Sequence, residues 1–392
     1  MRHIDSQHDR LRKAAAEPLD HGRLAAAKAA YTTRRVDMRV AGTLLTGELE
    51  PHSGDLVLAC IEKLGHHRHI ELGNGRRSVL YRADEIVVCY GNRYAPDQFE
   101  AVVPSDLGPC QLAAGGGIAA RVLSRHSSRR QATAITPIGL IGDRDGEPLN
   151  LTRWALAPTE TTGARPYTVA AIGTSMNSGK TTLAASLAHG LTKAGLSVGS
   201  AKVTGTGAGG DVWAMLDAGA KEALDFTDAG HATTYKLPLA DVERIFLTLT
   251  TALAARGLDI IVIEVADGLL QDETAALISS PVFAKSVDGV IFAAADAMGA
   301  VAGADWLRSR GLNVLGIGGL LTASPLARGE ANRATGIQVL SNELLSSGVW
   351  RPDRHFPYVS TFEGENQSSA TVTRIKRSGP PHAEERPAAL SV

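Results

Sequence analysis

The spacing of apolar and polar positions changes once along the chain, near residue 160. Between residues 38 and 153, short β-branched and apolar runs alternate with glycine-containing turns, which is typical of a small all-β barrel or sandwich. From residue 166 to 362, apolar runs of strand length alternate with longer helical stretches, which predicts parallel strands joined by helical crossovers. We therefore predict an α/β protein with a doubly wound, mostly parallel sheet, preceded by a small β-rich, barrel-like domain.

The same patterns set the domain boundaries. We assign residues 38–160 to the β-rich domain and residues 161–362 to the α/β domain. Residues 1–37 are rich in Ala, Arg and Asp and are predicted to be an N-terminal arm, which either packs on another subunit or is a partly ordered tail. Residues 363–392 are polar and contain two consecutive prolines, which predicts a disordered tail.

Individual elements follow from the hydrophobic runs. A glycine-rich turn at 115–117, whose glycines favour close backbone packing between the domains, precedes a predicted helix at 118–126. The other predicted helices are 183–193, 212–224, 239–256 and 301–310. The predicted strands are 39–45, 54–62, 68–72, 77–81, 85–90, 101–103, 136–143, 168–172, 197–203, 258–265, 288–294 and 312–320.

One stretch combines a strand, a polar loop and a helix: the apolar run 168–172 continues as GTSMNSGKTT and then as the helix 183–193. Such a loop holds polyphosphates, because its backbone N–H groups and the helix N-terminus point at the ligand. We expect Lys180 to reach the terminal phosphates and the Thr181 hydroxyl to bind Mg²⁺. The alternative is a helix cap followed by a surface lysine. The predicted phosphate-binding residues are Gly173, Thr174, Ser175, Met176, Asn177, Ser178, Gly179, Lys180, Thr181 and Thr182.

Two acidic residues follow other strands of the predicted sheet, where doubly wound folds bind their ligands. Asp211 comes after the second strand and a glycine-rich turn, and Glu264 lies at the end of the apolar strand 258–265. A carboxylate on a core strand is costly unless it is paired or binds a metal, whereas Asp211 could instead cap the following helix. Because Mg²⁺ prefers oxygen ligands, Thr181, Asp211 and Glu264 are the predicted metal ligands.

Composition excludes several classes of protein. The formal net charge of −1 argues against a protein that binds nucleic acid through a broad basic surface. No apolar run approaches the roughly 20 residues of a membrane span, and the N-terminus lacks a secretory apolar segment. Cys60, Cys89 and Cys110 form no close pair, so neither a disulfide framework nor a zinc cluster is indicated. We expect a cytoplasmic protein with no nucleic-acid or membrane partner.

Three polar stretches are further candidate sites. The loop 91–100 is dense in groups able to recognise a polar ligand, although its Asn and Asp would equally satisfy backbone donors. The stretch 225–235 carries His231, a candidate acid or base whose alternative is a surface-loop histidine. A metal site at His66, His67 and His69 is disfavoured, because adjacent residues of a strand point in opposite directions.

The loop GTSMNSGKTT has five residues between Gly173 and Gly179 instead of the usual four, and it resembles the phosphate loop of the dethiobiotin synthetase-like branch of P-loop proteins. That branch includes cobyrinic acid a,c-diamide synthase and the molybdopterin-guanine dinucleotide biosynthesis protein B. Lys202 is similar to the branch's substrate-facing lysine, and IVIEVADGLL resembles its strand that ends in a magnesium-binding glutamate. Val265 and Asp267 replace small residues of the family pattern. The resemblance covers about residues 168–345.

Neighbouring families fit less well. Partition and septum-site ATPases carry a signature lysine where this chain has Ser175, and glutamine-dependent amidotransferases need a late catalytic cysteine, whereas no cysteine follows Cys110. A weaker resemblance links the elements at 204–205 and 225–228 to D-glutamate N-acetyltransferase-type proteins, which would make the loop a site for coenzyme phosphates. A guanine-reading Asn-Lys-x-Asp motif is absent, so ATP is preferred over GTP.

The resemblance implies an ATP- and Mg²⁺-dependent ligase, synthetase or phosphotransferase. It would transfer a phosphoryl group to a small carboxylate-type substrate and so activate it for ligation or cyclisation, with Lys180, Lys202 and Glu264 as catalytic residues. We expect a homodimer. The alternatives are a nucleotide-driven switch or assembly factor that acts on a protein partner, and a coenzyme A-dependent N-acyltransferase.

Overall fold

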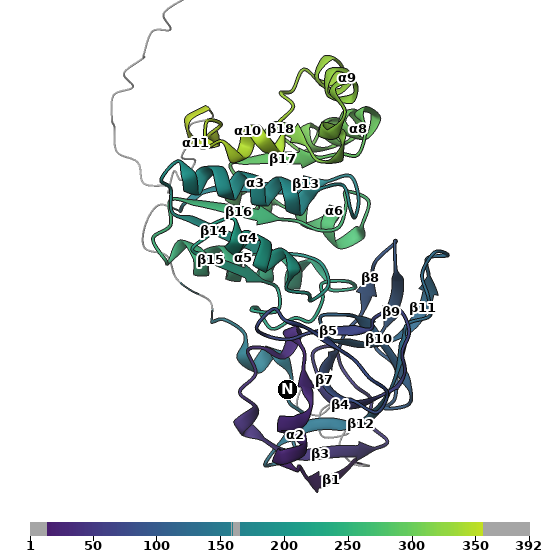
Figure 1. The fold of residues 1–392 in the computed structure, drawn as a ribbon. Helices are drawn as coiled ribbons and strands as arrows, with labels where there is room; N and C mark the ends of the chain where they lie inside the picture. Colours follow the sequence, from purple (N-terminus) through teal and green to yellow (C-terminus); the bar gives the residue numbers. More distant parts are fainter. Residues whose placement is uncertain (1–13, 158, 160–164, 356–392) are drawn as a thin grey trace, which may run out of the picture. The chain divides into compact units, whose positions relative to one another are not determined.

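The computed structural model describes residues 14–157, 159 and 165–355, which belong to one compact unit of the chain. The predicted tail at 363–392 and the first part of the predicted arm lie outside the described residues. A β-rich part precedes a parallel sheet with helices on both faces (Figure 1). The predicted fold class, an α/β protein with a barrel-like β-rich part before a doubly wound sheet, is confirmed.

The β-rich part contains one ten-stranded sheet and a separate two-stranded sheet made of β5 (His69–Glu71) and β6 (Arg77–Val79). The strands of the larger sheet are β1 (Ala14–Pro18), β2 (Lys28–Ala29), β3 (Ala41–Gly47), β4 (Leu56–Lys63), β7 (Glu85–Tyr90), β8 (Arg93–Tyr94), β9 (Phe99–Val102), β10 (Cys110–Ala114), β11 (Ile118–Arg125) and β12 (Thr133–Asp143). Short helical elements in this part are α2 (His21–Ala26), η1 (Tyr31–Thr33), η2 (Met38–Val40) and η3 (Leu151–Trp154).

The larger sheet closes on itself. Its strands run in the order β1-β3-β12-β4-β7-β11-β9-β8, and β10 pairs with both β11 and β12. The strands β12, β4, β7, β11 and β10 therefore form a ring without a free edge, as in a small barrel. Side chains of β4 alternate between two cores: Leu56 and Leu58 pack in one, Val57 and Ala59 in the other.

Two sequence-based assignments in this part are wrong. The predicted helix at 118–126 is the strand β11, because Ile118 and Ala119 fill opposite faces of the ring and pair with β7. Its alanines favour a helix locally, but tertiary pairing overrides this preference. The described residues of the predicted arm are also part of the sheet, since β1 pairs with β3 and β2 pairs with β7.

The second sheet has six parallel strands in the order β15-β14-β16-β13-β17-β18. The central strand β13 pairs with β16 and β17, so the loop that follows it opens at the middle of the sheet edge. The strands are β13 (Tyr167–Gly173), β14 (Val198–Lys202), β15 (Glu222–Asp225), β16 (Ile260–Glu264), β17 (Gly289–Ala293) and β18 (Val314–Gly318).

Helices cover both faces of this sheet, so each strand is apolar on both sides. Ala170 and Ile172 of β13 pack in one core, with α5 to α9, while Val169 and Ala171 pack in the other, with α3, α4 and α10. The helices are α3 (Lys180–Lys193), α4 (Gly210–Asp217), α5 (Leu239–Ala254), α6 (Asp272–Ile278), α7 (Pro281–Ser286), α8 (Ala297–Arg308), η4 (Leu320–Ala323), α9 (Pro325–Thr335), α10 (Asn342–Ser346) and α11 (Pro352–His355).

The predicted helix at 212–224 is wrong in its second half. The helix α4 ends at Asp217, Gly219 turns the chain with a φ of +97°, and β15 then pairs with the edge of β14. Ala218 and Ala220 continue the helical composition, so the turn depends on the one residue that tolerates positive φ.

A buried polar network joins the β-rich part to the parallel sheet. The hydroxyl of Tyr31 donates to Asp225 Oδ2 at 2.8 Å, and Arg34 Nη2 donates to Asp225 Oδ1 at 3.2 Å and to Asp228 Oδ2 at 2.7 Å. Asp225 is fully buried. Nearby, a Cβ on Gly116 would lie 2.0 Å from the carbonyl oxygen of Gly207, which confirms the predicted close backbone packing of the glycine-rich turn.

We expect Arg34→Ala to lower the free energy of unfolding by about 3 kcal/mol, because it leaves Asp225 buried without a cation. Urea denaturation measures this change. The matched control is Arg39→Ala, which removes the exposed ion pair with Asp37 and should change stability little. Equal losses in the two variants would contradict the assignment of Arg34 to a stabilising junction.

Candidate functional site

The loop between β13 and α3 is shaped by two glycines. A Cβ on Gly173 would lie 2.2 Å from Ser178 Oγ and 2.8 Å from Lys180 Cγ, so no side chain fits there. Gly179 has a φ of +98°, which turns the loop into the first turn of α3. The N-terminal N–H groups of α3 thereby face the loop and give it a positive end. The chain carries a P-loop nucleotide-binding fold.

Lys180 is folded back over this loop. Its Nζ donates to the carbonyl oxygen of Ser175 at 2.8 Å and to the carbonyl oxygen of Asp267. The side chain is buried, which lowers the pKa of its ammonium group, while the charges of Glu264 and Asp267 act in the opposite direction. The ammonium group therefore binds two carbonyl oxygens of the protein, whereas the sequence predicts that it binds the terminal phosphates of a nucleotide.

The three predicted metal ligands lie together at the sheet edge. Thr181 Oγ1 is 3.0 Å from Asp211 Oδ1 and 3.0 Å from Glu264 Oε1. Parallel register produces this meeting, because Glu264 lies opposite Ala171 on β13 and opposite Lys202 on β14. Lys202 Nζ forms an ion pair with Asp211. Lys202 is therefore in contact with this cluster, and Lys180 lines the same cavity as its members.

The protonation of Glu264 follows from its surroundings. It is 3% exposed, and burial together with the charge of Asp211 raises its pKa to about 7. The Thr181 hydroxyl has one hydrogen, so it donates to only one of its two carboxylate neighbours. If that hydrogen goes to Asp211, the second bond is completed by a proton on Glu264.

These residues fit a hard divalent cation. Glu264 Oε2 is buried and has no hydrogen-bond partner, so one carboxylate oxygen is available to a ligand that the protein itself does not supply. A hydroxyl and two carboxylates are the oxygen donors that Mg²⁺ takes beside nucleotide phosphates. The metal roles of Thr181, Asp211 and Glu264 stay a prediction that this geometry favours.

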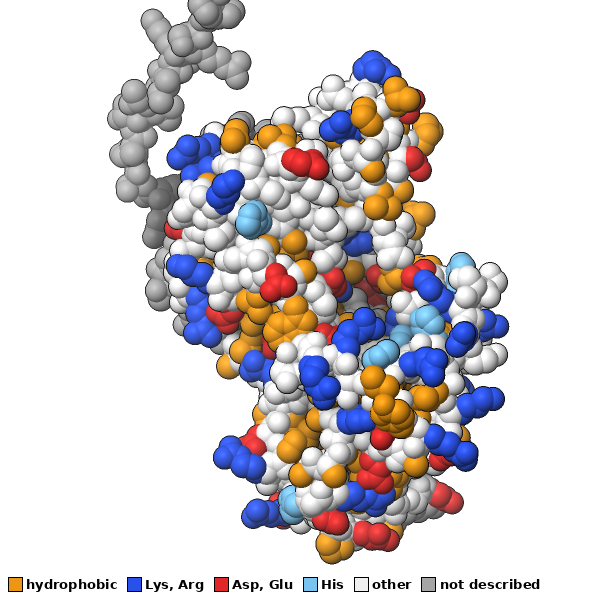
Figure 2. Space-filling model, in the orientation of Figure 1, with side chains coloured by type: hydrophobic (Ala, Val, Ile, Leu, Met, Phe, Trp, Pro, Cys, Tyr) orange, Lys and Arg blue, Asp and Glu red, His pale blue; other side chains and the backbone are white. Residues whose placement is uncertain are grey.

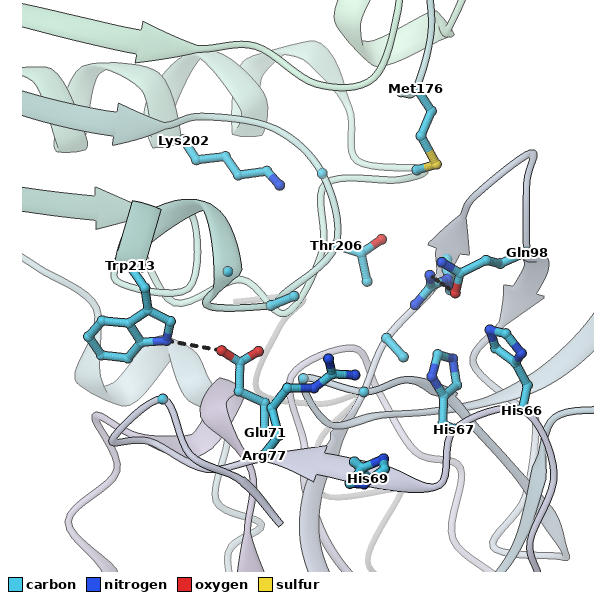
Figure 3. A pocket seen from close by; sticks show the side chains of 18 of the residues that line it. His66, His67, His69, Glu71, Arg77, Gln98, Met176, Lys202, Thr206 and Trp213 are labelled. Atoms are coloured by element: carbon cyan, nitrogen blue, oxygen red, sulfur yellow. Dashed lines mark hydrogen bonds between the residues drawn. The ribbon is translucent and has the colours of Figure 1, made fainter. Parts of the chain in front are cut away.

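Two cavities meet beside the P-loop. One, of about 440 Å³, is lined by Asn177, Lys180 and Thr181 among others. The second, of about 630 Å³, is lined by residues of β5 and β8, by the glycine-rich turn 115–117 and by Trp213 of α4 (Figure 3). In Figure 2, histidine and basic side chains gather around a hollow in the surface. The linings of the two cavities share Gln98, Met176, Lys202 and Asp267.

The predicted recognition loop 91–100 contributes to both cavities. Arg93 and Gln98 line the larger one, and Asp97 and Gln98 line the smaller one. Asn92 instead accepts from the backbone N–H of Val103 and donates to a backbone carbonyl, so it shapes the loop. Local sequence indicated a polar loop but gave no sign that Arg93 would be buried.

The other two polar stretches have different positions. His231 does not belong to the lining of either cavity; burial lowers its pKa, and the nearby charges are Arg244 and Asp241. His66, His67 and His69 do line the larger cavity. Among the residues that the structure describes, no group of three or more His, Cys, Asp or Glu side chains is arranged to hold a metal ion.

Sequence comparison gives no family: no family model matches the chain, and no curated protein matches it. Among solved structures, the chain is similar to the signal recognition particle 54 kDa protein of Aeropyrum pernix in complex with GDP, with a TM-score of 0.35 and 21% identity over 50% of this chain and 46% of that one. The chain thus spans about half the length of that protein.

Two further structures are similar to part of the chain. One is the signal recognition particle receptor FtsY of Elizabethkingia anophelis in complex with GDP, with a TM-score of 0.33 and 16% identity over 53% of this chain and 69% of that one. The other is a nucleotide-binding protein of Archaeoglobus fulgidus in complex with ADP, with a TM-score of 0.33 and 17% identity over 49% of this chain and 93% of that one. TM-scores this low carry no argument about function. The P-loop assignment rests on the strand, loop and helix described above, and the resemblance to the dethiobiotin synthetase-like branch stays a prediction.

No helix in the described part of the chain is long and apolar enough to cross a membrane.

We expect the contribution of Glu264 to the stability of the metal-free protein to fall as pH rises from about 4.5 to about 7, because Glu264 must lose a proton in a buried site. The folded-state pKa lies above the unfolded one, so the folded state binds the proton more tightly over this range. Glu264→Gln should remove this part of the pH dependence in urea denaturation without Mg²⁺. Glu330→Gln, an exposed carboxylate on α9, is the control and should leave it unchanged.

Proposed function

We propose that the protein binds Mg-ATP at the P-loop and transfers the γ-phosphoryl group to a small carboxylate-type molecule in the adjoining cavity. The observation that carries this proposal is the junction of the two cavities at Lys202, Met176, Asp267 and Gln98. A nucleotide whose phosphates follow the P-loop would end at this junction, and the larger cavity offers room for an acceptor on the far side of it.

Each residue of the cluster has a role in that reaction. The loop N–H groups and Lys180 would hold the β- and γ-phosphates, which requires Lys180 Nζ to exchange its carbonyl partners for phosphate oxygens. Thr181, Asp211 and Glu264 would hold Mg²⁺, which neutralises phosphate charge. Asp211 would then leave its ion pair with Lys202. The freed ammonium group of Lys202 faces the junction, where it would orient the acceptor and stabilise the transferred group.

The reaction is an in-line displacement at phosphorus. A carboxylate oxygen of the acceptor forms the new bond to the γ-phosphorus, the bond from that phosphorus to the β–γ bridging oxygen breaks, and ADP leaves. The product is an acyl phosphate, which is activated for the ligation or cyclisation implied by the resemblance to the dethiobiotin synthetase-like branch. The expected homodimer and cytoplasmic location remain predictions.

A nucleotide-driven switch is the second candidate, and one contact favours it. Asn177 Nδ2 of the P-loop donates to Asp97 Oδ2 at 3.2 Å, and Asp97 also pairs with Arg129 of the β-rich part. A nucleotide that moves the P-loop would therefore act directly on a loop of the other sheet. In that case ATP or GTP turnover would be slow alone and would rise only with a protein partner.

We expect Lys180→Ala to weaken binding of Mg-ATP by at least about tenfold, because it removes a charged donor to the phosphates. Isothermal titration calorimetry measures the affinity. Lys193→Ala, at the exposed end of the same helix, should bind as the wild type does. An unchanged affinity in Lys180→Ala would overturn the assignment of the nucleotide site.

Phosphoryl transfer predicts that small carboxylates accelerate release of ADP, and that hydroxylamine traps the product as a hydroxamate. Lys202→Met should lower this carboxylate-dependent turnover by at least about 100-fold while the protein still binds nucleotide. The exposed Lys221→Met is the control. Turnover that no carboxylate changes but a protein partner stimulates would favour the switch, and binding of acetyl-coenzyme A without ATP would favour the acyltransferase.

A further inference from the structure

Arg93 on β8 is a buried cation without a counter-ion. Its side chain is 7% exposed, and its Nη2 donates to Gln98 Oε1 at 2.8 Å. Its Nε is buried with no hydrogen-bond partner, and it forms no ion pair with any residue that the structure describes. Buried guanidinium groups are normally paired with carboxylates, because an unpaired charge in the interior is costly.

Burial does not neutralise Arg93. Desolvation lowers the pKa of its guanidinium to about 10, so the group stays protonated at neutral pH. The carboxylates of Asp97 and Asp267 are near enough to favour the charged form, but neither lies within ion-pair distance. The guanidinium of Arg93 therefore keeps its positive charge in the wall of the cavity, and the nearby carboxylates compensate that charge only in part.

The rest of the cavity lining does not supply the missing anion. Glu71 already has partners: its carboxylate accepts from Trp213 Nε1 at 3.0 Å (Figure 3). It also accepts from the backbone N–H of Gly209 at 2.9 Å. The carboxylate of Asp267 is buried in the same lining but lies outside ion-pair distance of Arg93. The remaining ionisable groups of the lining are basic: Arg68 and Arg77, which are exposed, Lys202, and the three histidines.

His66 and His67 contribute hydrogen-bond donors and acceptors to this wall, not a fixed charge. His67 Nε2 is 3.0 Å from the carbonyl oxygen of Ala113, so this nitrogen carries the hydrogen and Nδ1 is left as an acceptor. Burial and the nearby Arg93 lower the pKa of His67 to about 3, and burial also lowers that of His66. Both rings are neutral at pH 7, which leaves Arg93 as the buried cation on this wall of the cavity.

We infer that Arg93, with Gln98 beside it, binds an anionic group of the acceptor that is distinct from its reacting carboxylate. The acceptor is then a small molecule with two acidic groups: a carboxylate that reacts near Lys202, and a second carboxylate or a phosphate held by the guanidinium. The assignment of the reacting group rests on the proposed function. The anion site at Arg93 rests on its burial and missing counter-ion alone.

The test uses probes with a backbone of four heavy atoms, which differ in one terminal group: a methyl, a carboxylate or a phosphonate. The full-length protein, saturated with Mg²⁺ and the non-hydrolysable analogue AMP-PNP so that the P-loop is occupied, is titrated at constant ionic strength with butyrate, succinate and 3-phosphonopropionate. We expect succinate or 3-phosphonopropionate to raise the thermal unfolding midpoint at concentrations where butyrate does not. A larger effect of the phosphonate than of succinate assigns a phosphate to the Arg93 position, and the reverse assigns a carboxylate.

Arg93→Met keeps the apolar stem and removes the charge, and it should weaken binding of the dianionic probe by at least about tenfold. Arg93→Lys should retain part of the response, and Arg121→Met, on the exposed side of β11, should retain all of it. Because Arg93→Met also removes an unpaired buried charge, its unfolding midpoint without probe should equal or exceed that of the wild type.

Three results would overturn the inference: butyrate and both dianions act equally, no dianion changes the midpoint, or Arg93→Met responds as the wild type does. A large loss of stability in Arg93→Met without probe would show Arg93 to be a structural residue and would also overturn it. Binding of AMP-PNP is measured separately in every variant. A protein that binds dianions through Arg93 but never hydrolyses or transfers phosphate would overturn the proposed function and leave the anion site standing.

Discussion

Four charged side chains meet at one edge of the parallel sheet, and the balance between their charges is the main constraint on the site. Lys180, Lys202, Asp211 and Glu264 meet there because parallel strands all end on one side. Two ammonium groups face two carboxylates in a space that excludes most water, and one carboxylate oxygen is left without a partner. Such a cluster is costly for stability and suited to a ligand that brings its own charges, as Mg²⁺ with a polyphosphate does.

The same principle of incomplete compensation extends into the β-rich part. Arg93 lies inside the protein with an amide oxygen as its partner, whereas Arg34, at the junction with the parallel sheet, is paired with two aspartates. Arg93 is the more buried of the two, yet only Arg34 has carboxylates within ion-pair distance. The paired one stabilises the fold, and the unpaired one leaves a charge available to a bound molecule.

Much of the parallel sheet could be predicted from the sequence, because its signals are local. The P-loop, its helix and the apolar strand that ends at Glu264 can each be recognised from a short run of consecutive residues. The strands β11 and β15 could not be predicted, since alanine-rich segments become strands only when they pair with distant neighbours. The burial of Arg93 and the bond between Tyr31 and Asp225 depend in the same way on contacts between segments far apart in the chain.

The short helix α4 contacts both the β-rich part and the P-loop site. Its first turn carries Asp211, which faces the P-loop, and Trp213, whose indole N–H is bound by Glu71 of β5 and whose ring packs edge-on against Tyr31 at 6.1 Å between centroids. The same glutamate also holds the backbone N–H of Gly209, directly before the helix. Glu71 thereby holds the start of the helix that carries Asp211, although Glu71 does not line the cavity beside the P-loop. The position of Asp211 at the P-loop is set in part by a strand that lies outside that cavity.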